Sequence, residues 1–299
     1  MNIEKFLSRV VNKLNSGKIE FPHMEAELLL ANVLKKRREF VLSHPEYKLN
    51  ILQIIICRFY VVKRLKGIPL AYIVKEKKFY NYNFLINKNV LIPRPETELV
   101  VDEALKIAQV AAGKSRPVLF IDIGTGSGCI IISICKYLSS KGCDINNFMA
   151  TDISDKALSA AKKNAKLHKV DKIIKFLKGN LLVPILKEKL EISKYNLVIL
   201  ANLPYLTPFQ VKNSSTIQNE PKLALIAGQD GLKYYRKLFK QIKEFVGSNK
   251  TSFYLLCEID PGQANKIKRL ALNLMPEIKL IIKKDLRGLE RLIIIEKAY

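Results

Sequence analysis

The sequence lacks the features that would define a metal site, a disulfide framework or a membrane span. None of its five cysteines forms a Cys-x-x-Cys pair, and they stand at positions 57, 129, 135, 143 and 257. The three histidines are scattered, at positions 23, 44 and 168. No apolar run reaches the ~18 residues that a membrane-spanning helix needs. We therefore expect no metal, no membrane segment, and reduced thiols that are mostly buried.

The first residues also lack the features of a targeting signal. The segment "MNIEKFLSRVVNKLNSGK" contains Glu4 and has no apolar core followed by a cleavage site. A transit peptide would be richer in arginine and poorer in acidic residues. We expect this segment to form the first helix of a soluble, cytoplasmic protein.

Acidic residues are few in comparison with basic ones. Lys and Arg total 51 against 27 Asp and Glu, which gives a net charge of +24. Such a charge favours nucleic-acid binding. However, base-edge and bidentate phosphate contacts favour Arg. Only 11 of the 51 basic residues are Arg and 40 are Lys, which weakens this interpretation. Residues 1–75 hold 14 basic and 6 acidic residues, net +8, so the remaining residues carry +16. We interpret the charge as a solvated basic surface, and the alternative is a surface complementary to an acidic partner.

Hydrophobic periodicity divides the chain into three parts. "EAELLLANVL" and "ILQIIICRFYVVKRL" have helical spacing and predict a small all-helical domain over residues 1–75. "KFYNYNFLINKNVLI" predicts a β-hairpin linker over residues 76–93. From 94 to 299, apolar strands such as "VLFIDIG" and "YNLVILAN" alternate with helices. This alternation predicts an α/β fold with a doubly wound, mostly parallel, Rossmann-like sheet.

A glycine-rich turn, "IDIGTGSGCII", lies between a predicted strand and a predicted helix. Glycines let the backbone approach a ligand closely, and the start of a helix offers free N–H groups. A dinucleotide fingerprint would need glycine at position 129, which is Cys129. The spacing instead resembles the S-adenosylmethionine loop of Rossmann-like methyltransferases, and it comprises Gly124, Thr125, Gly126, Ser127 and Gly128.

The ends of the next two predicted strands carry further candidates for a cofactor site. Asp152 ends the second strand, 24 residues after Gly128, where a carboxylate can accept hydrogen bonds from both ribose hydroxyls. The structural alternative is that Asp152 only caps the following helix. Asn180 and Leu181 follow the third strand and would flank an adenine ring, unless they form an ordinary loop.

The fourth strand ends in Asn202-Leu203-Pro204-Tyr205. An amide or aromatic amine nitrogen is a poor nucleophile because its lone pair is delocalised. The side-chain oxygen of Asn202 and the backbone oxygen of Leu203 could each accept one N–H and aim the nitrogen at a methyl carbon, while Tyr205 lies on the flat face of the substrate. This would be catalysis by positioning and electrostatics, without a strong general base. The turn alone would serve a glutamine amide or the amino group of adenine equally well.

Together these segments resemble the HemK/PrmC family of protein-(glutamine-N5) methyltransferases, which act on peptide chain release factors. The most specific match is "PRPETE", residues 93–98, which adenine methylases with Asn-x-Pro-Tyr do not normally carry. The other matches are "GIPLAYI" (67–73), "VLIPRPETELVVDEAL" (90–105), "DIGTGSGCI" (122–130), "ATDISDKAL" (150–158), "NLPY" (202–205), "NEPKLALIAGQDGLKYYR" (219–236) and "KDLRGLERLIII" (284–295).

The resemblance implies a Rossmann-like methyltransferase domain at 94–299 that uses S-adenosyl-L-methionine. It also implies a helical N-terminal domain that helps to hold the release factor, and methylation of the glutamine of the Gly-Gly-Gln motif at N5. By motif match, the residues Gly124 to Gly128 and Asp152 would hold the cofactor, with Asn180 and Leu181 at the adenine. Asn202 would contact both cofactor and substrate, and residues 202–205 would hold the glutamine side chain. We expect a monomer that requires no nucleic acid.

Two positions depart from the family pattern. The usual Asn-Pro-Pro-Tyr is Asn-Leu-Pro-Tyr here, which keeps the carbonyl of Leu203 but loses a ring that pre-sets φ, worth roughly 0.4–1 kcal/mol. Asn180 stands where the family usually has Asp, and its amide oxygen can still accept a hydrogen bond from the adenine amino group. One alternative function is N6-adenine methylation of rRNA or DNA, because rRNA adenine dimethylases carry the same Asn-Leu-Pro-Tyr sequence. The other alternative is a module that binds the cofactor and catalyses no reaction.

Overall fold

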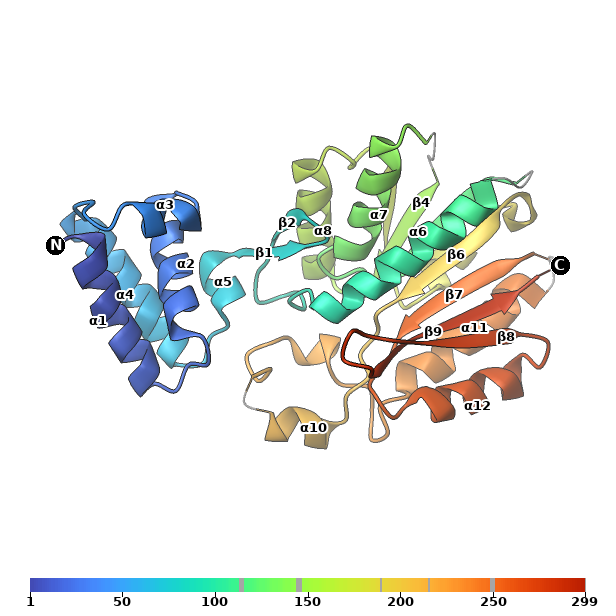
Figure 1. Cartoon of the computed structure of the whole chain (residues 1–299). Helices are drawn as coiled ribbons and strands as arrows, with labels where there is room; N and C mark the ends of the chain where they lie inside the picture. Colours follow the sequence, from blue (N-terminus) through green and yellow to red (C-terminus); the bar gives the residue numbers. More distant parts are fainter. Residues whose placement is uncertain (113–115, 144–146, 189, 215, 248–250, 299) are drawn as a thin grey trace. The chain divides into compact units, whose positions relative to one another are not determined.

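The computed structural model describes residues 1–112, 116–143, 147–188, 190–214, 216–247 and 251–298 (Figure 1). The chain forms two compact units. The first comprises Met1–Glu76 with Ser215–Asn219, and the second comprises Lys77–Ser214 with Glu220–Tyr299. None of the helices in the described part of the chain is both long and apolar enough to cross a membrane.

The first unit is helical, as the periodicity predicts. Asn2 and Asn50 begin two of its helices, because their side chains accept the N–H groups of Lys5 and Gln53 and so satisfy free donors of the first turn. Arg64 forms a bidentate ion pair with Glu25, at 2.5 and 3.1 Å, which joins two of the helices. The helices are α1 (Ile3–Ser16), α2 (Pro22–Leu34), α3 (Arg38–Ser43), α4 (Ile51–Leu65) and α5 (Leu70–Val74).

The second unit opens with a hairpin of β1 (Glu76–Phe79) and β2 (Tyr82–Leu85). Tyr80 and Asn81 adopt φ values of 48° and 63°, the left-handed pair that a tight hairpin turn requires. Residues 86–94, which the sequence placed mostly in the same hairpin, form no strand and lead to the short helix η1 (Pro95–Thr97).

The main sheet has seven strands in the order β5-β4-β3-β6-β7-β9-β8. The first five are parallel, whereas β9 runs antiparallel to both β7 and β8. The predicted α/β class with a mostly parallel sheet is therefore confirmed. The strands are β3 (Val118–Ile123), β4 (Phe148–Asp152), β5 (Ile174–Lys178), β6 (Asn196–Ala201), β7 (Phe253–Glu258), β8 (Lys279–Lys284) and β9 (Glu290–Lys297).

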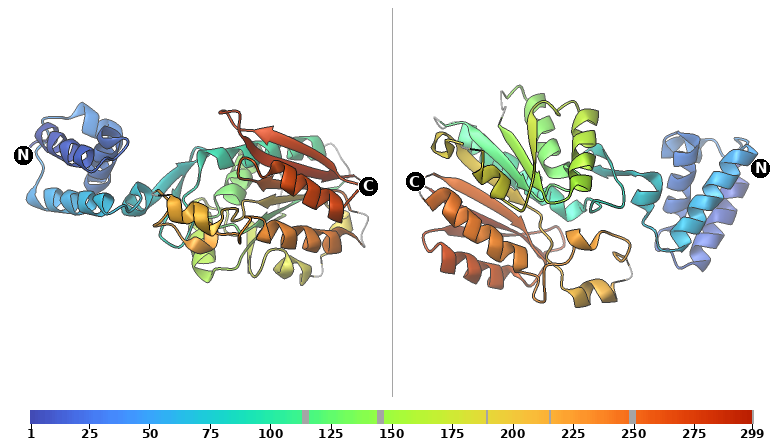
Figure 2. Two further views of the ribbon diagram at one scale, coloured as in Figure 1. Left: turned by 90° about the horizontal axis from the view of Figure 1, so that it is seen from below. Right: turned by 180° about the vertical axis from the view of Figure 1, so that it is seen from behind.

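Helices cover both faces of this sheet, as Figures 1 and 2 show. On one face lie α6 (Glu98–Ala112), α7 (Cys129–Ser140) and α8 (Asp155–Leu167), and on the other α11 (Lys233–Gly247) and α12 (Ala264–Leu274). The short helices are α9 (Val183–Leu186), η2 (Ile192–Lys194), α10 (Pro208–Asn213) and η3 (Lys222–Ala224).

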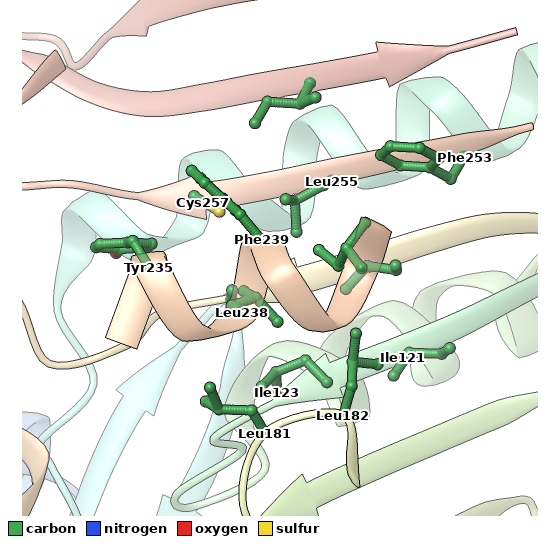
Figure 3. Close-up of a cluster of buried hydrophobic side chains, with 14 of the residues drawn as sticks. Ile121, Ile123, Leu181, Leu182, Tyr235, Leu238, Phe239, Phe253, Leu255 and Cys257 are labelled. Atoms are coloured by element: carbon green, nitrogen blue, oxygen red, sulfur yellow. The ribbon is translucent and has the colours of Figure 1, made fainter. Parts of the chain in front are cut away.

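One large apolar core lies between the sheet and α11. Side chains of α11 recur at helical spacing and meet alternate residues of β3 and β7, as Figure 3 shows for Tyr235, Leu238 and Phe239 against Ile121 and Leu255. All five are almost completely buried. This core fixes α11 to the strands. It therefore also fixes the carboxyl ends of the strands that belong to it, β3, β6 and β7.

This packing generates a stability prediction. Replacing Phe239, which is 0% exposed, by Ala should lower the free energy of unfolding by about 3–5 kcal/mol, since it leaves a cavity in the core. The matched change Phe209→Ala, at a ring that is 75% exposed, should shift it by less than about 0.5 kcal/mol. Urea unfolding followed by circular dichroism measures both, and equal losses would contradict this assignment of the core.

Candidate active site

Four neighbouring strands end at the same level of the sheet. Ile123 of β3 pairs with Thr151 of β4 and with Ala201 of β6, and Ala201 pairs with Cys257 of β7. The next residues along these strands are Gly124, Asp152, Asn202 and Glu258. Since ligands of open α/β sheets bind outside the carboxyl ends of the strands, this row is the expected place for a site.

A cavity of about 250 Å³ opens at this edge of the second unit. All the predicted site residues line it except Gly128 and Tyr205; those that do are Gly124, Thr125, Gly126, Ser127, Asp152, Asn180, Leu181, Asn202, Leu203 and Pro204. The structure thus brings four separate predicted segments, each at the end of a different strand, to one cavity.

The glycine turn is held against β4 by its backbone. The N–H groups of Gly124 and Thr125 both donate to the carbonyl of Thr151, each at 2.9 Å. Gly124 has φ of 73°, and a Cβ there would lie 3.2 Å from Cδ2 of Leu203. A side chain at this position would therefore strain the backbone and press on the Asn-Leu-Pro-Tyr turn, which accounts for the glycine.

Asp152 connects the glycine turn to the start of α8. Its carboxylate accepts the N–H of Gly126 at 2.9 Å and the N–H of Ser154 at 2.8 Å. Burial raises the pKa of Asp152, and these two N–H groups act in the opposite direction. The cap of α8 is Ser154, whose hydroxyl accepts the N–H of Ala157, so capping of α8 does not account for Asp152. A carboxylate has about four acceptor sites, which leaves Asp152 able to accept ligand hydroxyls.

Asp122 is a buried carboxyl that the sequence reasoning did not assign to the site. It accepts the hydroxyl of Thr125 at 2.6 Å through Oδ2, while Oδ1 is buried without a hydrogen-bond partner in the described part of the chain. Burial raises the pKa of Asp122 to about 7. An acidic residue inside the apolar strand "VLFIDIG" was the available signal, because an unpaired buried carboxyl is costly in a plain core.

Asn180 and Leu181 lie in the loop after β5. The N–H of Gly179 donates to the carbonyl of Asp152 at 3.0 Å, which ties this loop to the neighbouring strand end. Leu181 has φ of 55°, an uncommon conformation for a leucine, and its side chain joins the core below. Both residues reach the cavity beside Asp152.

Asn202 is oriented by a residue of the "PRPETE" segment. Its side-chain Nδ2 donates to Thr97 Oγ1 at 3.1 Å, so Oδ1 remains available as an acceptor. Leu203 is almost fully buried and belongs to the core cluster that contains Ile123. The turn is therefore fixed from both sides, by a hydrogen bond and by packing.

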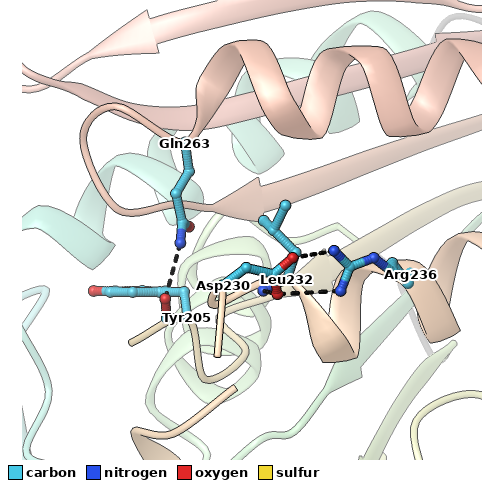
Figure 4. A network of polar contacts seen from close by, with 5 residues as sticks. All are labelled: Tyr205, Asp230, Leu232, Arg236 and Gln263. Atoms are coloured by element: carbon cyan, nitrogen blue, oxygen red, sulfur yellow. Dashed lines mark hydrogen bonds and ion pairs between the residues drawn. The ribbon is translucent and has the colours of Figure 1, made fainter. Parts of the chain in front are cut away.

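Tyr205 does not line the cavity that Asn202 lines. Its hydroxyl donates to Glu258 Oε1 at 3.3 Å, and its carbonyl accepts Gln263 Nε2 at 2.9 Å (Figure 4). A Cβ at Gly231 would lie 2.2 Å from the carbonyl oxygen of Tyr205, so only glycine fits there. The Asp230–Arg236 ion pair, also in Figure 4, holds the loop on which Gly231 stands.

Glu258 is the second buried carboxyl that the sequence reasoning missed. It is 2% exposed at the end of β7, and burial raises its pKa to about 7. Hydrogen bonds from the hydroxyls of Thr97 and Tyr205 and the charge of Arg291 act against this shift, while the charge of Glu96 adds to it.

The "PRPETE" and "NEPKLAL" segments form one wall of the cavity together. Arg94 forms an ion pair with Glu220, and the N–H of Ile92 donates to Glu220 Oε2 at 3.2 Å. Arg94, Thr97 and Leu223 line the cavity. Both segments carry the family resemblance, but the sequence did not predict that their side chains lie at the site.

Comparisons with known proteins agree with these motifs. A family model described as the PrmC N-terminal domain matches residues 5–74, and one described as a methyltransferase domain matches residues 115–248. The release factor glutamine methyltransferase of Dictyoglomus turgidum is 34% identical over 289 residues, which cover 94% of each chain. This chain belongs to the release factor glutamine methyltransferase family.

Some of the other relatives match this chain over almost their whole length, and others over about half of it. The family's protein from Mycoplasma mycoides subsp. mycoides is 33% identical and covers 96% of this chain and 97% of its own. A bifunctional methyltransferase of Rickettsia bellii is 32% identical over 91% of this chain, but the chain spans only about half, 51%, of that protein. The solved hMettl16 catalytic domain, in complex with MAT2A 3'UTR hairpin 6, shares 16% identity over 90% of this chain and 92% of its own, with a TM-score of 0.54. That likeness shows the Rossmann-like fold alone.

The buried Glu220 generates a prediction for the cavity wall. Replacing Glu220 by Ala should lower the free energy of unfolding by about 1–3 kcal/mol, because the Ile92 N–H and the Arg94 guanidinium both lose their partner. The control Glu191→Ala removes an ion pair with Lys194 that is exposed on both sides, and it should produce no measurable change. Urea unfolding of both variants measures this. A loss of unfolding free energy that is no larger for Glu220→Ala than for Glu191→Ala would contradict the claim that Glu220 holds the cavity wall together.

Proposed function

We propose that the protein transfers a methyl group from S-adenosyl-L-methionine to N5 of the glutamine in the Gly-Gly-Gln motif of peptide chain release factors. The observation that carries the proposal is the orientation of Asn202. Its Nδ2 is held by Thr97, so its Oδ1 is the atom available to a substrate N–H. Membership of the release factor glutamine methyltransferase family supports a glutamine amide as the substrate group.

The residues around the cavity fit an adenosine-containing cofactor. Gly124 and Gly126 leave room for a close backbone approach, Asp152 keeps acceptor capacity for ribose hydroxyls, and Asn180 and Leu181 would flank the adenine. Asp122 lies behind the glycine turn and supports it through its bond to the Thr125 hydroxyl, without lining the cavity itself. When bound, S-adenosyl-L-methionine would supply an electrophilic methyl group.

The chain's own groups would then orient the glutamine amide. Asn202 Oδ1 and the Leu203 carbonyl would each accept one N–H of the amide, which fixes the nitrogen and increases its electron density. The nitrogen would form its bond to the methyl carbon as the carbon–sulfur bond breaks, and one N–H proton would leave afterwards. Holding the amide in place thus replaces the work of a strong base.

The remaining partner assignments follow from this substrate. The N-terminal domain, residues 1–75, would help to hold the release factor, and the methyltransferase domain, residues 94–299, would carry the reaction. A substrate of translation would place the enzyme in the cytoplasm. The protein would act as a monomer and require no nucleic acid, and its basic residues would form a solvated surface, with complementarity to an acidic release factor as the alternative.

Methyl transfer from labelled S-adenosyl-L-methionine tests the reaction itself. Purified release factor should incorporate label, whereas a release factor with the Gly-Gly-Gln glutamine replaced and total ribosomal RNA should not. Label on the RNA alone would overturn the glutamine assignment and favour adenine methylation, the reading that Leu203 and the net charge of +24 leave open.

Asn202→Ala tests the role of the turn. Removing its side-chain oxygen should lower kcat by about 10²–10³-fold, because the amide loses one acceptor, while cofactor binding measured by calorimetry is partly kept. Asn273→Ala, an equal change on the exposed surface of α12, should leave kcat at the wild-type value. Near-wild-type turnover of Asn202→Ala would exclude the proposed mechanism.

A further inference from the structure

One face of α8 contacts both the glycine turn and the hairpin. Ala161, Asn164 and the C-terminal cap His168 are spaced by three and four residues, so they lie on the same side of the helix. A Cβ on Gly128 would lie 3.3 Å from Cβ of Ala161, which shows how closely α8 approaches the glycine turn. At the other end, Nε2 of His168 lies 2.9 Å from the carbonyl oxygen of Asn83 on β2. Asn164 stands between these two contacts.

Asn164 is 0% exposed, and its side-chain amide makes three hydrogen bonds. Oδ1 accepts the N–H of Leu85 at 2.7 Å, and Nδ2 donates to the carbonyl of Leu85 at 3.1 Å. Nδ2 also donates to the carbonyl of Ser127 at 2.9 Å. Both protons of the NH₂ group are therefore used. The orientation of the amide is fixed, because its oxygen has a donor and its nitrogen has two acceptors.

Through these contacts α8 takes the place of a third strand beside β2 (Figure 1). Asn164 and His168 bond to Leu85 and Asn83, which are two residues apart and so direct backbone groups to the same edge of the strand. Four helical residues rise about 6.0 Å and two strand residues about 6.6–6.8 Å, so the two spacings match. Since an isolated two-stranded hairpin is marginally stable, this pairing supports it.

The bond to Ser127 acts on the glycine turn itself. Ser127 is 3% exposed and lines the cavity. The peptide group that joins it to Gly128 is held at both ends, because Asn164 donates to its carbonyl and its N–H donates to the carbonyl of Thr125 at 2.8 Å. A buried carbonyl without a donor is unfavourable, so this peptide group would turn if Asn164 were lost. The glycine turn thus depends on a side chain that does not itself line the cavity.

We propose that Asn164 is a positioning residue that sets the shape of the glycine turn for S-adenosyl-L-methionine by holding the Ser127 carbonyl. The two bonds to Leu85 aim the remaining N–H of the amide at Ser127. The hairpin, which opens the second unit, therefore supports the cofactor loop through one buried amide. The inference rests on the proposed function, because it takes this cavity as the place of the cofactor. It predicts an effect on cofactor affinity, not on the methyl-transfer step.

Asn164→Leu and Asn164→Asp remove the bond to Ser127 and nearly keep the size of the side chain. Leucine makes none of the three hydrogen bonds, whereas aspartate can still accept the N–H of Leu85. Each variant should raise the Kd for S-adenosyl-L-homocysteine, measured by calorimetry, about 10- to 100-fold. In methyl transfer to release factor, the KM for S-adenosyl-L-methionine should rise by a similar factor, while kcat and the KM for release factor change less than about threefold.

Asn196→Leu is the matched control. Asn196 is also a buried asparagine of the second unit, and its Nδ2 donates to the carbonyl of Arg116 at 2.9 Å, but it does not line the cavity and begins β6 at the opposite end from Asn202. This variant should lower the unfolding midpoint and leave the Kd for S-adenosyl-L-homocysteine at the wild-type value. Wild-type Kd values in both Asn164 variants, or an equal rise in Asn196→Leu, would overturn the proposal.

A second readout uses the wild-type protein and needs no reaction. In protein labelled with ¹⁵N-asparagine, the side-chain N–H signals of Asn164, assigned through their proximity to Leu85, should move when S-adenosyl-L-homocysteine is added. The signals of Asn196 should stay in place. Unmoved Asn164 signals with the ligand bound would overturn the inference. Tight binding with these shifts, but no methylation of release factor, would overturn the proposed function and leave the role of Asn164 standing.

Discussion

The register of four parallel strands is the constraint on which the site depends. Because Thr151, Ile123, Ala201 and Cys257 are paired in a row, the chain leaves the sheet at Asp152, Gly124, Asn202 and Glu258 on one level. A shift by one residue in any strand would turn its last side chain to the other face of the sheet. The buried contacts of α11 with β3 and β7 hold this register, so the apolar core places the polar groups.

Two buried carboxyls, Asp122 and Glu258, are the main cost of this arrangement. Burial raises the pKa of each to about 7, and each has one oxygen without a hydrogen-bond partner in the described residues. Packing alone would favour an apolar residue at both positions, since a buried carboxyl without full hydrogen bonding is unfavourable. Asp122 bonds to the glycine turn and Glu258 to the Asn-Leu-Pro-Tyr turn. The two unfavourable groups thus support the two loops that would meet cofactor and substrate.

The sequence predicted the parts of the site that are contiguous in the chain. The glycine turn and the Asn-Leu-Pro-Tyr turn are local patterns at strand ends, and the alternation of elements predicted the confirmed fold class. Thr97 and Glu258 could not be placed in this way, because they meet the turn across 105 and 53 residues of sequence. That Tyr205 lies on the flat face of the substrate stays a prediction; the bond of its hydroxyl to Glu258 is a contact that the sequence of the turn does not encode. The direction of a side chain depends on a partner that only the fold supplies.

The same packing explains why leucine is tolerated where the family usually has proline. Loss of the ring removes a fixed φ worth roughly 0.4–1 kcal/mol. Leu203 has one more side-chain carbon than proline, and it is 3% exposed in the core beside Ile123. A buried CH₂ contributes about 0.8 kcal/mol, so the two terms are of equal size. The backbone carbonyl of residue 203 is the same in both, and the Asn202–Thr97 bond and the Tyr205–Glu258 bond hold the turn on either side of it. The geometry of the turn therefore rests on its neighbours more than on its second residue.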